Sequence, residues 1–471
     1  MVRIYFDKQI FSHLFKQEKP HYVKLLNQIR KQKASLFCFS HAHLLDLKND
    51  KTNIKYSKLE FMDSIVNDNY LSYHAIEKKT SCYLARPLEA FADVEKETDD
   101  IDFSSIFNFD TSELNPDDRE KLEKAKTLLT ETKLDFNLPE KENFDSSIVT
   151  PLENIIPFAQ EPMTIMQWSE HFMGMLKNMQ EDKSVYKGLR NVTDKHINNG
   201  KFTIEYDEID FNEDLKDSQL QKTFIEYVNS NLNPNGDKKV SKYDFFTNAY
   251  FTLDLLGISK EPSKSVRFNN MLNDGIHSYY GAYCDCVVSG DNGFLKKTRA
   301  LYKLLDIDTK VFHADDFIQS FDFIVEKEEK DQNSFSELLV NDLKNGLIVD
   351  SYKSIEIDRE TNTIKPIHNY LGFFNRIDKI VENGKSYLYF YRKTNNYSKF
   401  TFIREYELVV NNAVGIFGAD KYFKEKFEWE EEKDLIQSNN WYGRIWNFET
   451  FTLKIETNKG SGKLSILISL Q

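Results

Sequence analysis

The first 66 residues alternate between short apolar runs and longer segments with helical periodicity. Apolar residues alternate over 3–6 and stop at Asp7, and the stretch 9–31 carries apolar side chains at helical spacing. We expect Pro20 to kink or divide this helical stretch, because proline removes a backbone donor. The run 35–39 is typical of a buried strand. The first elements are therefore a strand, a broken helix and a second strand.

Ser40 follows the second strand at the position where a helix N-cap belongs, and a helix is predicted from His41 onward. A further helix is predicted at 52–66. Strands that alternate with helices in this way are typical of a parallel sheet.

A second block with the same alternation occurs more than 150 residues later. Its predicted elements are, in order, helices at 242–256 and 268–282, a buried strand at 284–289, a helix at 293–305, a strand at 309–313 and a short helix at 315–321. Two such blocks around an unlike region predict one doubly wound core with an insertion.

The remaining segments predict two accessory parts. Helical patterns at 117–130 and 163–179 predict a mainly helical insertion, whereas alternation at 387–392, 400–408, 451–456 and 463–468 predicts antiparallel strands. We therefore expect an α/β protein with a Rossmann-like parallel core. The expected boundaries are 1–79 and 240–325 for the two core parts, 80–239 for the insertion and 326–471 for a mostly antiparallel β domain.

Charge and cysteine content narrow the classes of function. The net charge of −13 argues against a protein that coats nucleic acid by bulk electrostatics, so a nucleic-acid path would need local Lys and Arg clusters. Four cysteines are too few for a disulfide framework in a chain of this length. No apolar run approaches the roughly 20 residues that span a bilayer. We expect a cytoplasmic protein with no membrane partner.

Four aspartates fall where the two blocks would meet. Asp7 ends the first strand, Asp291 follows the strand at 284–289, Asp46 lies on the helix after the second strand, and Asp274 lies on the helix before the later strand. In a parallel sheet the carboxyl ends of the strands share one crevice. Clustered carboxylates need a compensating cation, and Mg²⁺ or Mn²⁺ suits oxygen ligands without nearby Cys and His pairs.

Three segments resemble the ordered motifs of PIN-like domain nucleases. They are Ile4-Tyr-Phe-Asp7, Ser40-His-Ala-His-Leu-Leu-Asp46, and the stretch from Asp274 to Asp291 that ends Val-Val-Ser-Gly-Asp. The resemblance covers about residues 1–75 and 240–322. It implies a nuclease fold that uses Mg²⁺ or Mn²⁺, most often to cut RNA, with Asp7, Asp46, Asp274 and Asp291 as catalytic metal ligands.

Structural roles compete with each of these assignments. Asp7 could end a strand into a turn, Asp291 could cap the next helix, and Asp46 could be a solvated helix residue. Asp285, at the start of its strand, is a weaker ligand candidate. For substrate contacts we name Ser289, which could bind Asp7 or a phosphate or merely end its strand.

Nearby basic and histidine residues give weaker signals. Lys296, in a short basic cluster with Lys297 and Arg299, could meet backbone phosphates, although a solvated helix face explains the cluster equally well. His41 and His43 flank the Ser40 cap, where a structural role is favoured over a general base. The aromatic residues of the C-terminal domain are ordinary sheet residues in the favoured interpretation, rather than a base-stacking platform.

The function expected from the sequence is a metal-dependent endonuclease, acting on single-stranded RNA through a metal-activated water. Its partner would be nucleic acid, with a regulatory protein partner conceivable through the C-terminal domain and a toxin or defence role suggested by family analogy alone. The rival from another class is a non-catalytic scaffold or protein-interaction module. A 5′-nuclease-like activity on structured DNA would need an arch, which the insertion could supply. The sequence leaves the oligomeric state and the choice of RNA or DNA open.

Overall fold

The computed structural model forms two compact units. It describes residues 2–32, 35–96, 116–134, 162–204, 208–237, 239–259, 268–324, 331–458 and 462–470. The first unit comprises residues 1–91, 277–295 and 302–471, and the second comprises residues 92–276 and 296–301. Each unit is described separately below.

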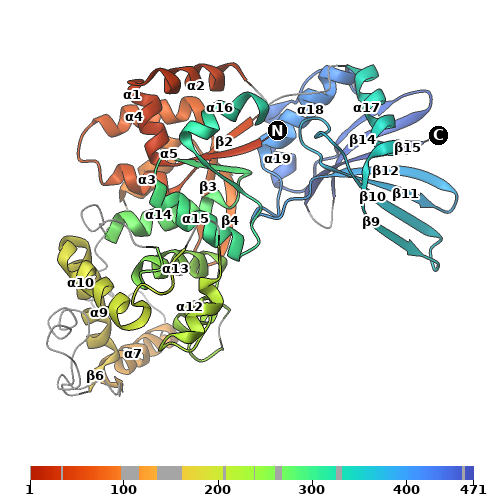
Figure 1. Cartoon of the computed structure of the whole chain (residues 1–471). Coiled ribbons are helices and arrows are strands. Elements are labelled where there is room, and N and C mark those ends of the chain that lie inside the picture. Colours follow the sequence, from red (N-terminus) through yellow and green to blue (C-terminus); the bar gives the residue numbers. More distant parts are fainter. Residues whose placement is uncertain are drawn as a thin grey trace. The chain divides into compact units, whose positions relative to one another are not determined.

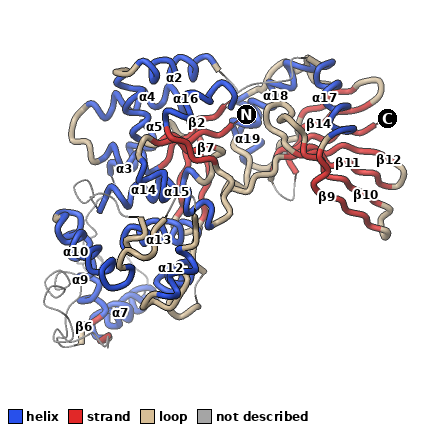
Figure 2. The backbone as a smooth tube through the Cα atoms, viewed as in Figure 1, coloured by secondary structure: helices blue, strands red, loops and turns tan. Residues whose placement is uncertain are grey.

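The first unit contains a six-stranded sheet, in which β2 and β7 are labelled among the red strands of Figure 2. Its order is β4-β3-β2-β1-β7-β8. The strands are β1 Val2–Phe6, β2 Ser35–Ser40, β3 Asn69–His74, β4 Lys79–Leu84, β7 Cys286–Ser289 and β8 Lys310–His313. All neighbours are parallel except β3 and β4. The sheet is therefore mixed, because an antiparallel hairpin closes one edge of an otherwise parallel sheet.

Helices lie between these strands or follow them in the chain. They are α1 Lys8–Lys16, α2 Pro20–Lys31, α3 His41–Lys48, α4 Ile54–Val66, α5 Pro87–Lys96, α14 Phe268–Gly281, α15 Asn292–Leu304 and α16 Ala314–Ile324. Figure 1 shows α1, α2, α4 and α16 gathered on one face of the sheet, in agreement with the packing of α2 on α16 and of α1 on α4. Pro20 is the first residue of α2, so the predicted division of the helix is confirmed.

The carboxyl ends of β1 and β7 lie side by side. Residues 4–6 of β1 pair with residues 286–288 of β7, and the Asp7 amide donates to the Val288 carbonyl at 3.0 Å. From β1 the chain crosses to β2 on one side of the pair, whereas from β7 it crosses to β8 on the other side. A reversal of this kind is where ligands bind in open parallel sheets, and Asp7 and Asp291 both follow strands that end there.

Two sequence interpretations of this sheet need correction. No strand was expected between 67 and 84, where the structure has the β3–β4 hairpin. Strand β7 begins at Cys286, two residues later than expected, because the chain turns through Tyr283 and Cys284 after α14.

The described part of the second unit is mainly helical. Its helices are α7 Pro116–Glu131, α9 Ile165–Glu181, α10 Lys183–Thr193, α11 Phe211–Asp214, α12 Phe224–Leu232 and α13 Lys242–Leu255, joined by the short pair β5 Lys133–Leu134 and β6 Met163–Thr164. Buried polar groups are paired in its core: the Tyr186 hydroxyl donates to Asp254, and the Arg190 guanidinium lies 3.4 Å from the same carboxylate.

The C-terminal part of the first unit is a seven-stranded antiparallel sheet. Its order is β13-β14-β15-β12-β11-β10-β9. The strands are β9 Leu347–Ser354, β10 Arg359–Lys365, β11 Arg376–Glu382, β12 Lys385–Tyr391, β13 Arg444–Asn447, β14 Phe451–Asn458 and β15 Lys463–Leu470; the accompanying helices are α17 Gln332–Asn345, α18 Ile403–Phe417 and α19 Trp429–Gln437. The antiparallel prediction is confirmed for three of the four named segments.

The fourth segment, 400–408, is wrong as a strand, because most of it lies in α18. The period-two alternation ends at Phe402, and from Tyr406 the buried positions continue at 409, 410 and 413. That spacing is helical.

A buried ion pair joins the two sheets of the first unit. Arg3 on β1 is 2% exposed and donates through Nε and Nη2 to the two oxygens of Glu405 on α18, at 2.7 and 2.6 Å. Arg392 bridges Glu405 at 3.3 Å and Asp285 at 2.5 Å, and Asp285 also accepts the Arg3 amide at 2.8 Å. Burial alone lowers the pKa of Arg3, but Glu405 and Asp285 more than offset this, so Arg3 stays charged. The C-terminal sheet is therefore fixed to the central strand of the other sheet.

Over the described ranges, the helices lack the combination of length and apolar character that crossing a membrane requires.

Candidate active site

Asp7 lies at the end of β1 and is held from two sides. Its Oδ1 accepts the Gln9 amide at 3.1 Å, which caps α1, and its Oδ2 accepts the hydroxyl of Ser289. Ser289 ends β7 and is fully buried. Its hydroxyl oxygen also accepts the Asp291 amide at 3.0 Å. Of the alternatives left open by the sequence, Ser289 binds Asp7, and its burial keeps it from a phosphate in solution.

Asp291 begins the turn into α15 beside this pair. Its Oδ1 accepts the amides of Gly293 and Phe294 at 2.7 and 3.0 Å, so it caps the helix as the structural interpretation predicted. The residue is exposed. Asp291 and Asp7 therefore share Ser289 as a link between the two strand ends.

Asp46 enters the same region from the last turn of α3. Its Oδ1 lies 2.9 Å from the Lys8 ammonium, and its Oδ2 lies 3.0 Å from Nε2 of His277 on α14. The Asp46 side chain is only 13% exposed, whereas that of Lys8 is 56% exposed. Asp46 is therefore not the solvated helix residue of the structural alternative.

The two carboxylates differ in their electrostatic surroundings. Burial raises the pKa of Asp7; His277 and the Ser289 hydroxyl oppose this rise, and the charge of Asp46 adds to it. Burial also acts to raise the pKa of Asp46, but the hydrogen bonds and charges of His277 and Lys8 bring it below its usual value. Asp46 thus contributes a stable negative charge that acts on Asp7.

A buried polar network lies beneath these carboxylates. Tyr5 on β1 places its hydroxyl 2.7 Å from Nδ1 of His277 and 2.6 Å from the Ser40 hydroxyl. His43 lies 2.7 Å through Nε2 from the Phe6 carbonyl oxygen, and its Nδ1 accepts the Ser40 amide at 3.1 Å. Burial lowers the pKa of His43 to about 3. His43 is therefore neutral and makes a hydrogen bond through each ring nitrogen. This is the structural role that the sequence favoured over a general base.

Asp274 lies three residues before His277 on α14 and is half-buried; by its contacts it belongs to the second unit. Its assignment as a fourth ligand stays a prediction.

Two other candidates have different roles from those considered. Asp285 lies at the opposite end of the sheet from Asp7 and pairs with Arg392, which together with Arg3 keeps its pKa low despite burial. It is not part of this cluster. In the predicted basic cluster, Lys296 is exposed on α15, but Lys297 is fully buried and stacks 4.9 Å above the Tyr250 ring. Lys297 therefore cannot reach a phosphate.

His277 and Lys8 were not among the residues expected at this site. Lys8 directly follows Asp7, and His277 interrupts an apolar helical run one turn after Asp274. Both residues matter only because Asp46 reaches them, and neither is within 30 residues of Asp46 in the sequence.

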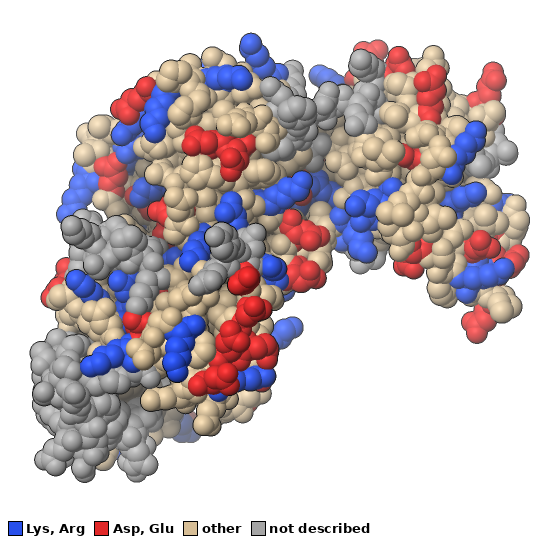
Figure 3. Space-filling model, in the orientation of Figure 1, with Lys and Arg blue, Asp and Glu red and all other residues tan. Residues whose placement is uncertain are grey.

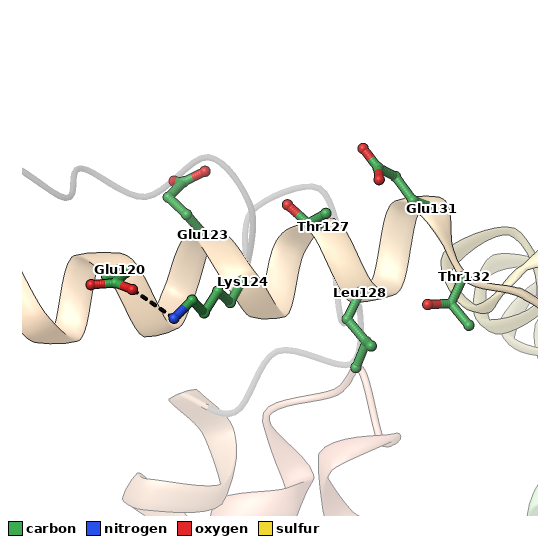
Figure 4. Close-up of a pocket in the computed structure, with 7 residues that line it drawn as sticks. All are labelled: Glu120, Glu123, Lys124, Thr127, Leu128, Glu131 and Thr132. Atoms are coloured by element: carbon green, nitrogen blue, oxygen red, sulfur yellow. Dashed lines mark ion pairs between the residues drawn. The ribbon is translucent and has the colours of Figure 1, made fainter.

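Two further hollows of the described surface each lie along a single helix, α7 or α17. Figure 3 shows both basic and acidic side chains on the face drawn, with acidic side chains gathered in one area of it. A shallow hollow on α7 of the second unit is lined by residues of one short stretch: Glu120, Glu123, Lys124, Thr127, Leu128, Glu131 and Thr132 (Figure 4). Its Lys124 is paired with Glu120 at 2.6 Å. One helix surface without an opposing wall does not enclose a ligand.

Within the described residues, no three His, Cys, Asp or Glu side chains are already placed to coordinate a metal ion. Comparisons with family models, curated proteins and solved structures found no match to this chain.

Proposed function

We propose that this chain is a metal-dependent nuclease of PIN-like type, acting on single-stranded RNA, with Asp7, Asp46 and Asp291 at its centre. The observation that carries the proposal is the meeting of three separate segments at the carboxyl ends of β1 and β7. Asp7 and Asp291 share Ser289, and Asp46 is near enough for its charge to raise the pKa of Asp7. A carboxylate pair of this kind needs a compensating cation.

The residues present fit Mg²⁺ or Mn²⁺ in their chemistry. The donors are carboxylate oxygens, and no thiolate lies among them. The Lys8 ammonium now supplies the positive charge beside Asp46, and its exposed side chain can move away. Asp7, Asp46 and Asp291 would hold the ion. When bound, such an ion activates water and offsets charge on a phosphodiester.

The chain's own residues would prepare this site before substrate arrives. Ser289 fixes Asp7, and the α15 amides fix one oxygen of Asp291. Lys8 would be free to contact a phosphate oxygen once it leaves Asp46, because its side chain is mostly exposed. Because these side chains are held in place before substrate binds, less conformational entropy is lost on the way to the reaction.

A metal-dependence assay tests the proposal. Purified full-length protein is expected to cleave labelled single-stranded RNA with Mn²⁺ or Mg²⁺ and to be inactive in chelator, with DNA cut more slowly. Asp46→Asn should reduce the rate by at least about 100-fold, because losing a ligand should cost no less than the 10 to 100-fold typical of groups that only orient a ligand. The matched control is Asp50→Asn, which removes an ion pair to Lys58 outside the cluster. Undiminished cleavage in chelator, or by Asp46→Asn, contradicts the proposal.

A second candidate is a non-catalytic scaffold, favoured by the occupation of both Asp46 oxygens by Lys8 and His277. Absence of cleavage together with absence of Mn²⁺ binding would select it.

Lys8 provides a separate prediction about metal affinity. Lys8→Met is expected to tighten Mn²⁺ binding by up to about fivefold, because an exposed ion pair of at most about 1 kcal/mol no longer competes for Asp46. Calorimetric titration of Mn²⁺ measures the change. Lys16→Met, an exposed lysine at the other end of α1, serves as the control and should leave the affinity unchanged. Weaker Mn²⁺ binding by Lys8→Met would show that Lys8 does not compete for the site.

A further inference from the structure

His277 links the carboxylate cluster to the interior of the sheet. Its ring is 2% exposed and uses both nitrogens: Nε2 lies 3.0 Å from Asp46, and Nδ1 lies 2.7 Å from the Tyr5 hydroxyl. A ring with both nitrogens occupied and almost no exposed surface cannot reach a substrate. Its contribution must pass through Asp46.

The hydrogen bond from His277 to Asp46 has one possible direction. A carboxylate only accepts, so Nε2 donates to Asp46. The fully buried Tyr5 hydroxyl lies 2.7 Å from Nδ1 and holds the other side of the ring. The Tyr5 hydroxyl is in turn 2.6 Å from the Ser40 hydroxyl. A continuous hydrogen-bonded chain therefore runs from β2 through β1 and α14 to Asp46.

Packing fixes the ring as well. His43 meets His277 edge to face with the ring centroids 4.6 Å apart, and the Tyr5 ring lies 5.9 Å from it. His43 is itself held by the Phe6 carbonyl oxygen and the Ser40 amide. A side chain that is bonded at both ends and packed on its faces has few alternative rotamers, and this limits the rotation of its partner carboxylate.

We propose that His277, oriented by the Tyr5 hydroxyl, is a positioning residue that fixes the Asp46 carboxylate for binding a divalent cation. This inference rests on the proposed function, because it assumes that Asp46 is a ligand. His277 touches neither substrate nor reacting atoms. Loss of a residue that hydrogen-bonds to a metal ligand typically weakens metal binding by about 10 to 100-fold.

The test is direct Mn²⁺ titration of the full chain, with melting temperature and cleavage rate measured on the same samples. His277→Phe keeps an aromatic ring but removes the donor, and should weaken Mn²⁺ binding by about 10 to 100-fold. His277→Gln restores an N–H donor and should recover most of the affinity. Tyr5→Phe removes only the hydroxyl that orients the ring and should cost about 3 to 10-fold, near the lower end of that range. At saturating Mn²⁺, the cleavage rates of these variants should approach that of the wild type.

A matched control separates positioning from stability. The buried Tyr302 hydroxyl donates to the Ser278 carbonyl at 2.6 Å. Ser278 directly follows His277 on α14. Tyr302→Phe should lower the melting temperature as Tyr5→Phe does, yet leave Mn²⁺ affinity unchanged. If His277→Phe does not fold, the comparison of Tyr5→Phe with Tyr302→Phe decides the question alone.

Two failures can be told apart. If the wild type binds Mn²⁺ and cleaves RNA, but Tyr5→Phe and His277→Phe bind Mn²⁺ as tightly as the wild type, the positioning role is wrong and the nuclease stands. Equal losses of affinity in Tyr5→Phe and Tyr302→Phe would also overturn the positioning role. If the wild type neither binds Mn²⁺ nor cleaves, the proposed function fails, and the inference fails with it.

Discussion

The Asp7→Asn variant is expected to lose cleavage by at least about 100-fold while keeping the melting temperature of the wild type. The change removes a negative charge from the centre of the cluster but preserves the shape of the side chain. Asn is as good an N-cap as Asp, so the Gln9 amide keeps its acceptor at the start of α1. Cleavage of labelled RNA in Mn²⁺ and thermal unfolding, measured on one preparation, give both quantities.

Two companion variants sharpen this result. Asp291→Asn should behave in the same way, because Asn can also cap α15. Ser289→Ala leaves Asp7 in place but removes the hydroxyl that holds it, and about 10 to 100-fold should be lost. Cleavage by Asp7→Asn at the wild-type rate, with a folded protein, would remove Asp7 from the mechanism.

The Arg3→Met variant is expected to destabilise the first unit by about 3 to 5 kcal/mol, the usual cost of removing one partner of a buried ion pair. Glu405 is fully buried and accepts two hydrogen bonds from Arg3. Without Arg3, its remaining basic partner is Arg392, at 3.3 Å from one oxygen. Denaturant unfolding followed by tryptophan fluorescence reports the loss, because all Trp residues except Trp168 lie in the C-terminal part.

A double variant distinguishes charge burial from packing. Arg3→Met combined with Glu405→Leu removes both charges and should recover more than half of the lost stability, because two apolar side chains replace an unpaired carboxylate. The exposed pair of Arg86 and Asp63 supplies the control: Arg86→Met should cost no more than about 1 kcal/mol. If Arg3→Met is as mild as this control, the ion pair does not fix the two sheets together.

The order of strands and helices around β1 could be predicted, because the periodicity of each segment is local. Pro20 marked the break between α1 and α2, and the apolar run before Ser289 marked β7. The β3–β4 hairpin was missed because its strands are only partly buried and carry a weak apolar pattern. The helix α18 was mistaken for a strand because Phe400 and Phe402 alternate just before the helical spacing begins at Tyr406.

The site was only partly predictable for a related reason. The positions of Asp7 and Asp291 follow from strand ends, which sequence patterns locate well. The partners of Asp46 do not follow from any pattern, because His277 is 231 residues away in the chain and its contact depends on how α14 packs beside β1. Asp285 shows the converse: the sequence offered it as a weaker ligand candidate, yet it lies at the opposite end of the sheet from Asp7, where it pairs with Arg392.

The pairing of β1 with β7 has a consequence for synthesis. A ribosome that adds roughly 5–20 residues each second releases β7 about 15 to 60 seconds after β1. Until then the nascent chain has no Ser289 to hold Asp7, and Arg3 still lacks Glu405, which emerges more than 100 residues later. A chain whose synthesis stalls before residue 289 contains Asp7 and Asp46 but lacks Ser289, which links Asp7 to Asp291. Assembly of the proposed site is therefore delayed until most of the protein has been made.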